Sequence, residues 1–196
     1  MALSDIDASL HAKFEIHEWR HASAVLLNDF PNEWADVLDV LSRFVLRKSW
    51  ITVGGGSKSD VSGWIDRALM EKGWIEKKFE TSIVVDNIAT QSPTHKVDCF
   101  KNQVGLEIEW NNKDPFFDRD LNNFRLLFEL RAIAVGIIVT RCDELQRIFD
   151  DLGRGKSYGN STTHMSKLLP RLEGGAGGGC PVLVFGIKDV LFDPAT

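Results

Sequence analysis

Three carboxylates near the middle of the chain have a spacing that suits a metal site. Asp98 is followed nine residues later by Glu107 and two residues after that by Glu109. The surrounding residues 96–110 alternate between polar and apolar side chains, as in two strands joined by a tight turn. Side chains two apart on a strand share a face, so Glu107 and Glu109 project together, and a hairpin can bring Asp98 beside them. Clustered carboxylates repel one another without a cation, and Mg²⁺ prefers oxygen ligands, so the pattern indicates metal-assisted hydrolysis.

The same alternation has a second, simpler interpretation. Leu106, Ile108 and Trp110 face the opposite way from the two glutamates and would enter a hydrophobic core. A strand with one apolar and one charged face is commonly a strand whose charged face is solvated. Spacing alone therefore leaves both the metal site and the solvated face open.

The composition describes an ordinary globular protein. Of the 196 residues, 43% are hydrophobic and 26% are charged, which is enough for one sizeable core. We expect a single domain over residues 1–196, with an N-terminal helical part over about 1–75 and a catalytic core over about 76–190. The net charge of −5 carries no global signal for nucleic acid, although a local basic cleft is enough to neutralise phosphates.

Cysteine use and hydropathy favour a cytoplasmic protein. Cys99, Cys142 and Cys180 are odd in number and far apart, which is typical of reduced core cysteines. The N-terminus lacks the basic and apolar segments of a signal peptide. No apolar run approaches the roughly 20 residues that a membrane span needs, so we expect no membrane contact.

Periodicity predicts a mixture of helices and strands. Residues 132–140 and 181–187 are nearly continuous apolar runs, which indicates strands buried on both faces of a parallel or mixed sheet. The glycine-rich segment 54–59 is predicted to be a flexible loop without the spacing of a phosphate-binding P-loop. Together the elements predict an α/β fold with a central mixed β-sheet flanked by helices. Helices are predicted over 23–47 with a break near Pro31, and over 60–72, 118–132, 143–152 and 165–172, with a further strand over 79–85.

The segment 96–110 resembles the active-site segment of the BglII/BstYI type II restriction endonucleases, so we expect a restriction-endonuclease-like core with the PD-(D/E)xK nuclease fold. In that family an Asp is followed nine positions later by Glu-x-Gln. Asp98 and Glu107 match the first two positions, while Glu109 stands where the family has Gln, as in the Glu-x-Glu of the related enzyme BamHI. The downstream helices and strands also follow the family order, so the resemblance covers about residues 30–190.

The resemblance implies Mg²⁺-dependent phosphodiester hydrolysis at these carboxylates. Asp98 and Glu107 would be metal ligands, together with the backbone carbonyl of Ile108. Glu109 occupies the position that orients or deprotonates the attacking water, and its role as a general base or as a ligand of a second metal stays open. Two further residues could add a carboxylate to the site, Glu71 and Glu76. Each could equally be a solvated residue at a helix end.

The resemblance also implies contacts to double-stranded DNA and a homodimer. The glycine-rich segment 153–160 lies where the family has a sequence-reading loop, and its arginine can bond guanine in bidentate fashion. The polar residues directly after the catalytic strand would lie near the scissile phosphate. A palindromic DNA site has two-fold symmetry, which a homodimer matches. We therefore expect a homodimer with helix 118–132 or its neighbours at the interface. The candidate DNA contacts are Asn111, Asn112, Lys113, Arg154, Lys156, Ser157, Asn160 and Lys58.

Three functions are compatible with these features, and the first is favoured. It is a type II restriction endonuclease that cuts a short palindrome, with a cognate DNA methyltransferase expected in a neighbouring gene. Members of the group commonly cut sites containing GATC, but Arg154 replaces a smaller residue of those members, so another core sequence stays open. The alternatives are a repair or mobile-element nuclease of looser specificity and a non-catalytic DNA-binding module. The intact carboxylates argue against the last, because they are costly without a metal.

Overall fold

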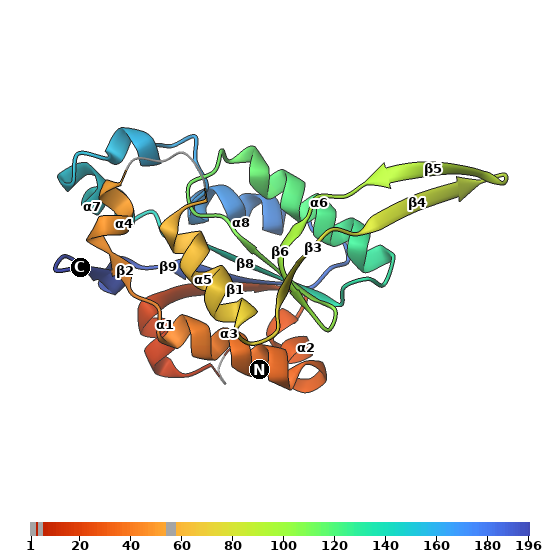
Figure 1. Ribbon diagram of the computed structural model, residues 1–196, viewed down its shortest axis with the longest axis horizontal. Coiled ribbons are helices and arrows are strands. Elements are labelled where there is room, and N and C mark those ends of the chain that lie inside the picture. The colour runs from red at the N-terminus through yellow and green to blue at the C-terminus, as the bar shows by residue number, and fades with distance from the viewer. Residues whose placement is uncertain (1–2, 4–5, 54–57) are drawn as a thin grey trace.

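The computed structural model describes residues 3, 6–53 and 58–196, so most of the predicted loop at 54–59 lies outside the described residues. Within them, a six-stranded mixed sheet forms the centre of the molecule (Figure 1). In sheet order the strands are β1 (Phe14–Trp19), β9 (Val182–Ile187), β8 (Val135–Arg141), β7 (Val104–Ile108), β6 (Val97–Lys101) and β3 (Ile75–Lys77). Strands β7, β8 and β9 run parallel, whereas β1, β6 and β3 each run antiparallel to their inner neighbour.

The two predicted buried strands, β8 and β9, are neighbouring interior strands of this sheet. Every residue of both strands is buried. Their side chains alternate between the two faces, so Ile137 and Val139 pack into one hydrophobic core while Ile138 packs into the other. Because both faces are covered, both need apolar residues, and this produces the continuous apolar runs in the sequence.

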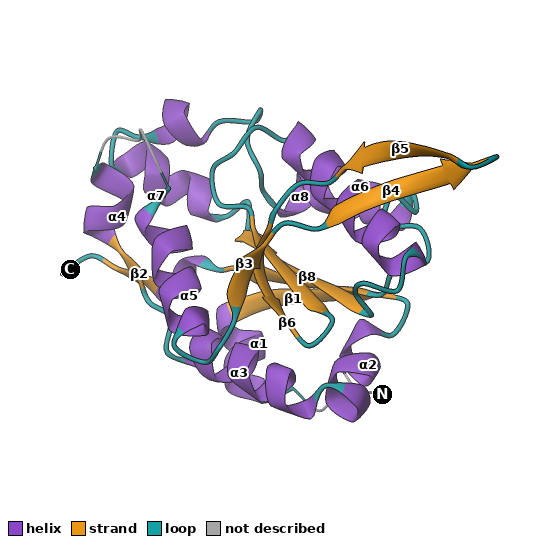
Figure 2. Ribbon diagram, turned by 45° about the vertical axis from the view of Figure 1, so that its right-hand side comes forward, coloured by secondary structure: helices purple, strands orange, loops and turns teal. Residues whose placement is uncertain are grey.

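Helices cover both faces of the sheet (Figure 2). On one side, α3 (Pro31–Ser42) and α5 (Asp60–Met70) share a core with the sheet, and on the other side α6 (Pro115–Glu129) and α8 (Met165–Glu173) do so. This arrangement confirms the predicted α/β fold with a central mixed sheet flanked by helices. The remaining helices are α1 (Ala8–Lys13), α2 (Ala22–Asp29), α4 (Lys48–Thr52) and α7 (Leu145–Asp151), with short 3₁₀ helices over Gly155–Tyr158 and Asp189–Leu191.

The N-terminal region departs from its predicted elements. The helix predicted over 23–47 is divided at Pro31 as expected, but it ends at Ser42. Residues beyond it form β2 (Leu46–Arg47), which pairs in parallel with β10 (Phe192–Asp193), a long-range contact that local periodicity does not reveal. Strand β1 also lies in this region and was not predicted, because only its first residue is fully buried and its pattern is weak.

A two-stranded hairpin projects from the body of the molecule (Figure 1). It pairs β4 (Glu80–Val85), which matches the strand predicted at 79–85, with β5 (Ile88–Pro93), which was not predicted. Both residues of its turn, Asp86 and Asn87, have positive φ, as a tight hairpin turn requires. The large apolar side chains of the hairpin are 53% to 70% exposed, and they are Ile83, Val84, Val85 and Ile88.

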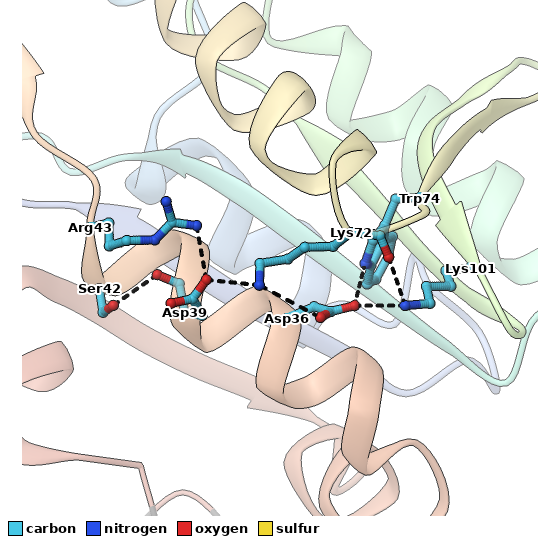
Figure 3. A network of polar contacts seen from close by, with 7 residues as sticks. All are labelled: Asp36, Asp39, Ser42, Arg43, Lys72, Trp74 and Lys101. Atoms are coloured by element: carbon cyan, nitrogen blue, oxygen red, sulfur yellow. Dashed lines mark hydrogen bonds and ion pairs between the residues drawn. The ribbon is translucent and has the colours of Figure 1, made fainter.

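A polar network fixes the turn of the β6–β7 hairpin against the helices (Figure 3). The Lys101 ammonium donates to Asp36 Oδ2 and to the carbonyl oxygen of Lys72, each at 2.8 Å. Trp74 Nε1 donates to the same Asp36 oxygen at 3.1 Å, and Lys72 Nζ lies 2.9 Å from a carboxylate oxygen of Asp39. Because Asp36 and Asp39 belong to α3, the network ties the hairpin that carries the predicted carboxylates to the helical layer.

Candidate functional site

Asp98 and Glu107 face each other where β6 and β7 separate. The last strand pair at this end of the hairpin joins Cys99 to Leu106. Beyond it, the Asp98 N–H donates to Glu107 Oε2 at 3.3 Å, and the Ile108 N–H donates to Asp98 Oδ2 at 3.1 Å. The carboxylates thus satisfy backbone donors that the diverging strands leave unpaired, and this holds both side chains at the open end of the hairpin.

Glu107 is almost completely buried, with 1% of its surface exposed. Burial, followed by the charges of Asp120 and Asp98, raises the pKa of Glu107 well above its ordinary value of 4.5. Its second oxygen, Oε1, has no hydrogen-bond partner among the described residues. A buried carboxylate oxygen without a donor is costly unless a proton or a cation lies beside it. This side chain therefore fits the predicted role of a ligand for a hard cation.

Glu109 is also 1% exposed, but both of its oxygens have partners. Asn112 Nδ2 donates to Oε2 at 2.8 Å, and Arg119 Nη2 donates to Oε1 at 3.3 Å. Burial, followed by the charge of Asp120, raises the pKa of Glu109 to about 9. The residue predicted to be a base or a second ligand is therefore held by a neighbour three residues later in the chain and by a side chain from α6.

Asp120 is a fourth carboxylate at this place, and it was not predicted from the sequence. It lies on α6, is fully buried, and accepts a hydrogen bond from Arg119 Nε at 2.7 Å. Burial raises the pKa of Asp120 above its ordinary value. Residue 120 lies at helical spacing from Phe117 and Phe124, which are core residues of the same helix. A charged residue on an apolar helix face was thus the signal that could have identified it.

Asp98 lines a cavity of about 590 Å³. Ile108, whose carbonyl is the third predicted ligand, lines the same cavity, and so does Glu76, which pairs with Lys96 at 2.8 Å. Glu71 is exposed at the end of α5 and is not among the residues that line it. The predicted DNA contacts that line this cavity are Lys58, Asn111, Asn112 and Arg154.

The remaining predicted DNA contacts lie outside this lining, but their segments are joined. Lys113 pairs with Thr162 in an isolated β-bridge, and the Thr163 N–H donates to the carbonyl oxygen of Asn112 at 2.9 Å. The segment after β7 and the glycine-rich loop therefore lie side by side, as two parts of one DNA-binding surface would. The exposed candidates on these segments are Lys113, Lys156, Ser157 and Asn160.

A buried arginine at the end of β8 supports the glycine-rich loop. Arg141 Nη2 donates to the carbonyl oxygen of Tyr158 at 2.7 Å and to Thr162 Oγ1 at 2.9 Å. The Tyr158 ring stacks on Phe149 with 4.0 Å between ring centroids. The loop is therefore anchored to the central sheet, and its exposed side chains project from a fixed base.

Comparison with protein-family models places the chain in a known group. The model for the restriction endonucleases BglII/BglIII matches residues 14–187. The chain belongs to the BglII/BglIII restriction endonuclease family. The match runs from the first residue of β1 to the last residue of β9, so it spans the whole central sheet and the hairpin that carries the carboxylates. A search of curated proteins found no match.

Membership of the BglII/BglIII family makes the chain a nuclease that acts on DNA and confirms the predicted restriction-endonuclease-like core. Restriction endonucleases generally use Mg²⁺. Within the described residues, no group of three or more His, Cys, Asp or Glu side chains is arranged to hold a metal ion. The unpartnered Glu107 oxygen is nevertheless the kind of group that a cation satisfies.

Two other predictions concern the chain as a whole. Cys99, Cys142 and Cys180 are buried and form no disulfide, as expected for reduced core cysteines. Over the ranges that the structure describes, no helix combines the length and apolar character needed to cross a bilayer.

Proposed function

We propose that this protein is a type II restriction endonuclease that hydrolyses phosphodiester bonds of double-stranded DNA at a short palindromic site, with Mg²⁺ as cofactor. The observation that carries the proposal is the Asp98–Glu107 pair at the open end of the β6–β7 hairpin. Asp98 shares a cavity with several candidate DNA contacts, which is what cleavage of a bound duplex needs. Family membership supports the same class of reaction.

Asp98, Glu107 and the backbone carbonyl of Ile108 would hold the ion. Carboxylate and carbonyl oxygens are the ligands that Mg²⁺ prefers, and Glu107 offers an oxygen without a donor. When bound, Mg²⁺ lowers the pKa of a water molecule and offsets charge on the phosphate. The hydrogen bonds that Asp98 and Glu107 accept from the backbone restrain both side chains beforehand, so less ordering is required on binding.

Glu109 has two candidate roles, as the general base for the attacking water or as a ligand of a second ion. Both roles need the ionised carboxylate. Because the pKa of Glu109 is about 9, its carboxyl group keeps a proton at neutral pH in the metal-free protein. A cation beside Glu107 favours loss of that proton. Either role would therefore depend on metal loading.

The candidate DNA contacts differ in what they would bind: the scissile phosphate and adjacent bases, base edges, or other phosphates. Asn111 and Asn112 lie three and four residues after β7 and line the cavity with Asp98, so they would contact the scissile phosphate or adjacent bases. Arg154 lines the same cavity from the glycine-rich loop and would bond guanine, while Lys58 would contact phosphate. A GATC-containing palindrome is the first sequence to test, because the family resemblance implies it.

Cleavage of phage DNA tests the proposal directly. Purified protein with Mg²⁺ should convert phage DNA into discrete fragments, and EDTA should stop the reaction. A smear of fragments would instead support a nuclease of loose specificity. Uncut DNA that is still bound would support a non-catalytic DNA-binding module and contradict both nuclease hypotheses.

A homodimer is proposed because a palindrome presents the same contacts on both strands. The apolar face of α6 is buried within the chain, which leaves exposed positions such as Leu130 at its end. The projecting β4–β5 hairpin is a second candidate surface, since an isolated two-stranded hairpin with exposed apolar side chains gains stability when covered. Sedimentation of Leu130→Lys and Val84→Lys distinguishes them, because only the variant at the interface should become monomeric. A monomeric parent protein would contradict the homodimer.

A cytoplasmic location and a genetic partner complete the proposal. The three buried, unpaired cysteines suit a reducing compartment. A DNA methyltransferase encoded beside this gene would protect the host sites, as a genetic partner and not as a bound subunit. The enzyme should leave native host DNA intact but cut the same DNA after amplification, because amplification removes the methylation. This result would support the pairing with a methyltransferase.

A further inference from the structure

Glu109 is held from two sides by side chains that line different cavities. Asn112, whose Nδ2 donates to Glu109 Oε2 at 2.8 Å, lines the cavity that contains Asp98. Arg119, whose Nη2 donates to Glu109 Oε1 at 3.3 Å, lines a second cavity of about 360 Å³ beside α6. The position of this buried carboxylate is therefore set by its protein contacts and not by solvent.

Arg119 is itself fixed by Asp120. Its Nε donates to Asp120 Oδ1 at 2.7 Å, and its guanidinium carbon lies 4.2 Å from the centre of the Phe116 ring. Nη2 lies 2.7 Å from the same Asp120 oxygen and 3.3 Å from Glu109 Oε1, so the guanidinium bridges the two carboxylates.

The location of Asp120 follows from the close packing of α6 on the sheet. Phe124, one helical turn after Asp120, packs on Gly105 and Gly136, which are paired across β7 and β8. A Cβ atom at Gly136 would lie 2.4 Å from the Phe124 ring, so a side chain there would push the helix away. Gly105 precedes Glu107 by two residues on the same strand face. The glycine pair thus brings the first turns of α6 onto the two glutamates.

Stability alone does not explain a carboxylate at this position. Asp120 shares its helix face with the core residues Leu121, Phe124 and Leu127, and its carboxyl group also shares a side-chain hydrogen bond with Glu109. Replacing a buried ion pair by well-packed apolar residues is commonly neutral or stabilising. Asp120 is therefore better explained by a role in the site than by helix packing.

We propose that Asp120 is a positioning residue of the catalytic centre formed by Asp98, Glu107 and Glu109: it orients Arg119, and Arg119 fixes the carboxylate of Glu109 beside Glu107. The inference rests on the proposed nuclease function. In this proposal helix α6 sets the position of the Glu109 carboxylate, although Glu109 follows directly after strand β7. It also means that the effect of Asp120 on turnover depends on the position of Glu109, and not on the charge that Asp120 exerts on Glu107.

A double-mutant cycle tests whether Asp120 acts through Glu109. Asp120→Asn keeps the size of the side chain and an oxygen for Arg119 but removes the charge. We expect its kcat on a plasmid with one cleavage site to fall about 10- to 100-fold, the range for outer-shell partners of metal ligands, with KM for DNA and the unfolding temperature near parental values. In a Glu109→Gln background the same change should cause no further loss. The positioning role would be overturned by losses in kcat that are additive in the double variant. A parental kcat for Asp120→Asn, or its failure to fold, would overturn it as well.

Chemical rescue tests the part played by Arg119. Arg119→Ala should lose turnover, and millimolar guanidinium should restore it several-fold, because the second cavity gives a small cation access to Glu109. Arg125→Ala is the matched control, since Arg125 is exposed on the same helix and bonds Asn122; it should keep parental turnover without responding to guanidinium. A folded Arg119→Ala that guanidinium does not rescue would overturn the inference. A parent protein that cuts no DNA would instead contradict the proposed function itself.

Discussion

Glu107 accepts the backbone N–H of Asp98 at 3.3 Å, so the two predicted metal ligands are joined across the end of the β6–β7 hairpin. Asp98 in turn accepts the N–H of Ile108, the residue whose carbonyl is the third predicted ligand. One small set of groups therefore both closes the gap between the diverging strands and presents oxygens for a cation. Changes to these residues should separate metal-dependent chemistry from DNA binding.

Asp98→Ala should abolish cleavage while leaving DNA binding measurable. Even outer-shell partners of a metal commonly account for 10- to 100-fold in activity, so loss of a ligand should reduce cleavage more than about 100-fold. Cleavage is measured with Mg²⁺, and binding by mobility shift with Ca²⁺. Asp60→Ala is the matched control, because Asp60 lines the same cavity from α5 and should cut like the parent. Cutting retained by Asp98→Ala would remove this residue from the site.

The metal-free protein should lose stability as the pH rises, because Glu109 is buried. Its pKa is about 9 in the folded protein against an ordinary value of 4.5. The contribution to stability is fully present below pH 4.5 and is lost as the pH rises through 9, since ionisation favours the unfolded chain. Glu109→Gln cannot ionise, so in EDTA its unfolding temperature should exceed that of the parent increasingly between pH 5 and 9.

The control for this pH dependence is Glu80→Gln, which changes an exposed glutamate on β4. It should keep the pH slope of the parent protein. An equal slope for the parent and Glu109→Gln would contradict a buried, protonated Glu109.

The sequence predicted the parts of the site that depend on local order. Strand period and a tight turn bring Asp98, Glu107 and Glu109 together within fifteen residues without long-range packing, and the family resemblance then predicts their roles in the site. Asp120 and Arg119 were not assigned to the site, because their place depends on how closely α6 packs on the Gly105–Gly136 pair. That approach is a tertiary property, and a helix pattern alone does not contain it.

The same distinction explains the successes and failures in the fold. Strands β8 and β9 were predicted because burial on both faces produces continuous apolar sequence. Strand β1 lies at the sheet edge with one fully buried residue, and β2 is two residues long and exists through its pairing with β10. Elements that depend on a distant partner leave little trace in local periodicity.

Lys101→Met should loosen the hairpin from the helical layer. It removes two 2.8 Å hydrogen bonds, to Asp36 and to the carbonyl oxygen of Lys72, at a partly buried position. We expect a loss of about 1–2 kcal/mol in the free energy of unfolding, after allowance for partial exposure. Urea denaturation measures this. Lys78→Met, at an exposed position beside β3, should change the midpoint little, and a similar midpoint for both variants would contradict the anchoring role.

Arg154 and Lys156 should differ in how they contribute to DNA recognition, although they lie two residues apart. Arg154 lines the cavity with Asp98, whereas Lys156 is exposed on the short 3₁₀ helix of the loop. A bidentate arginine–guanine pair gives about 1–3 kcal/mol of discrimination, so Arg154→Ala should lower the preference for cognate over single-mismatch DNA by roughly 5- to 150-fold.

Lys156→Ala should instead weaken binding to all sequences about equally and reduce the slope of log affinity against log salt by about 1. Fluorescence anisotropy with cognate and mismatched duplexes, at several salt concentrations, measures both effects. Because the two variants share one loop, a general disturbance of the loop would change both in the same way. Equal losses on cognate and mismatched DNA for Arg154→Ala would assign this residue to phosphate contact and contradict base reading.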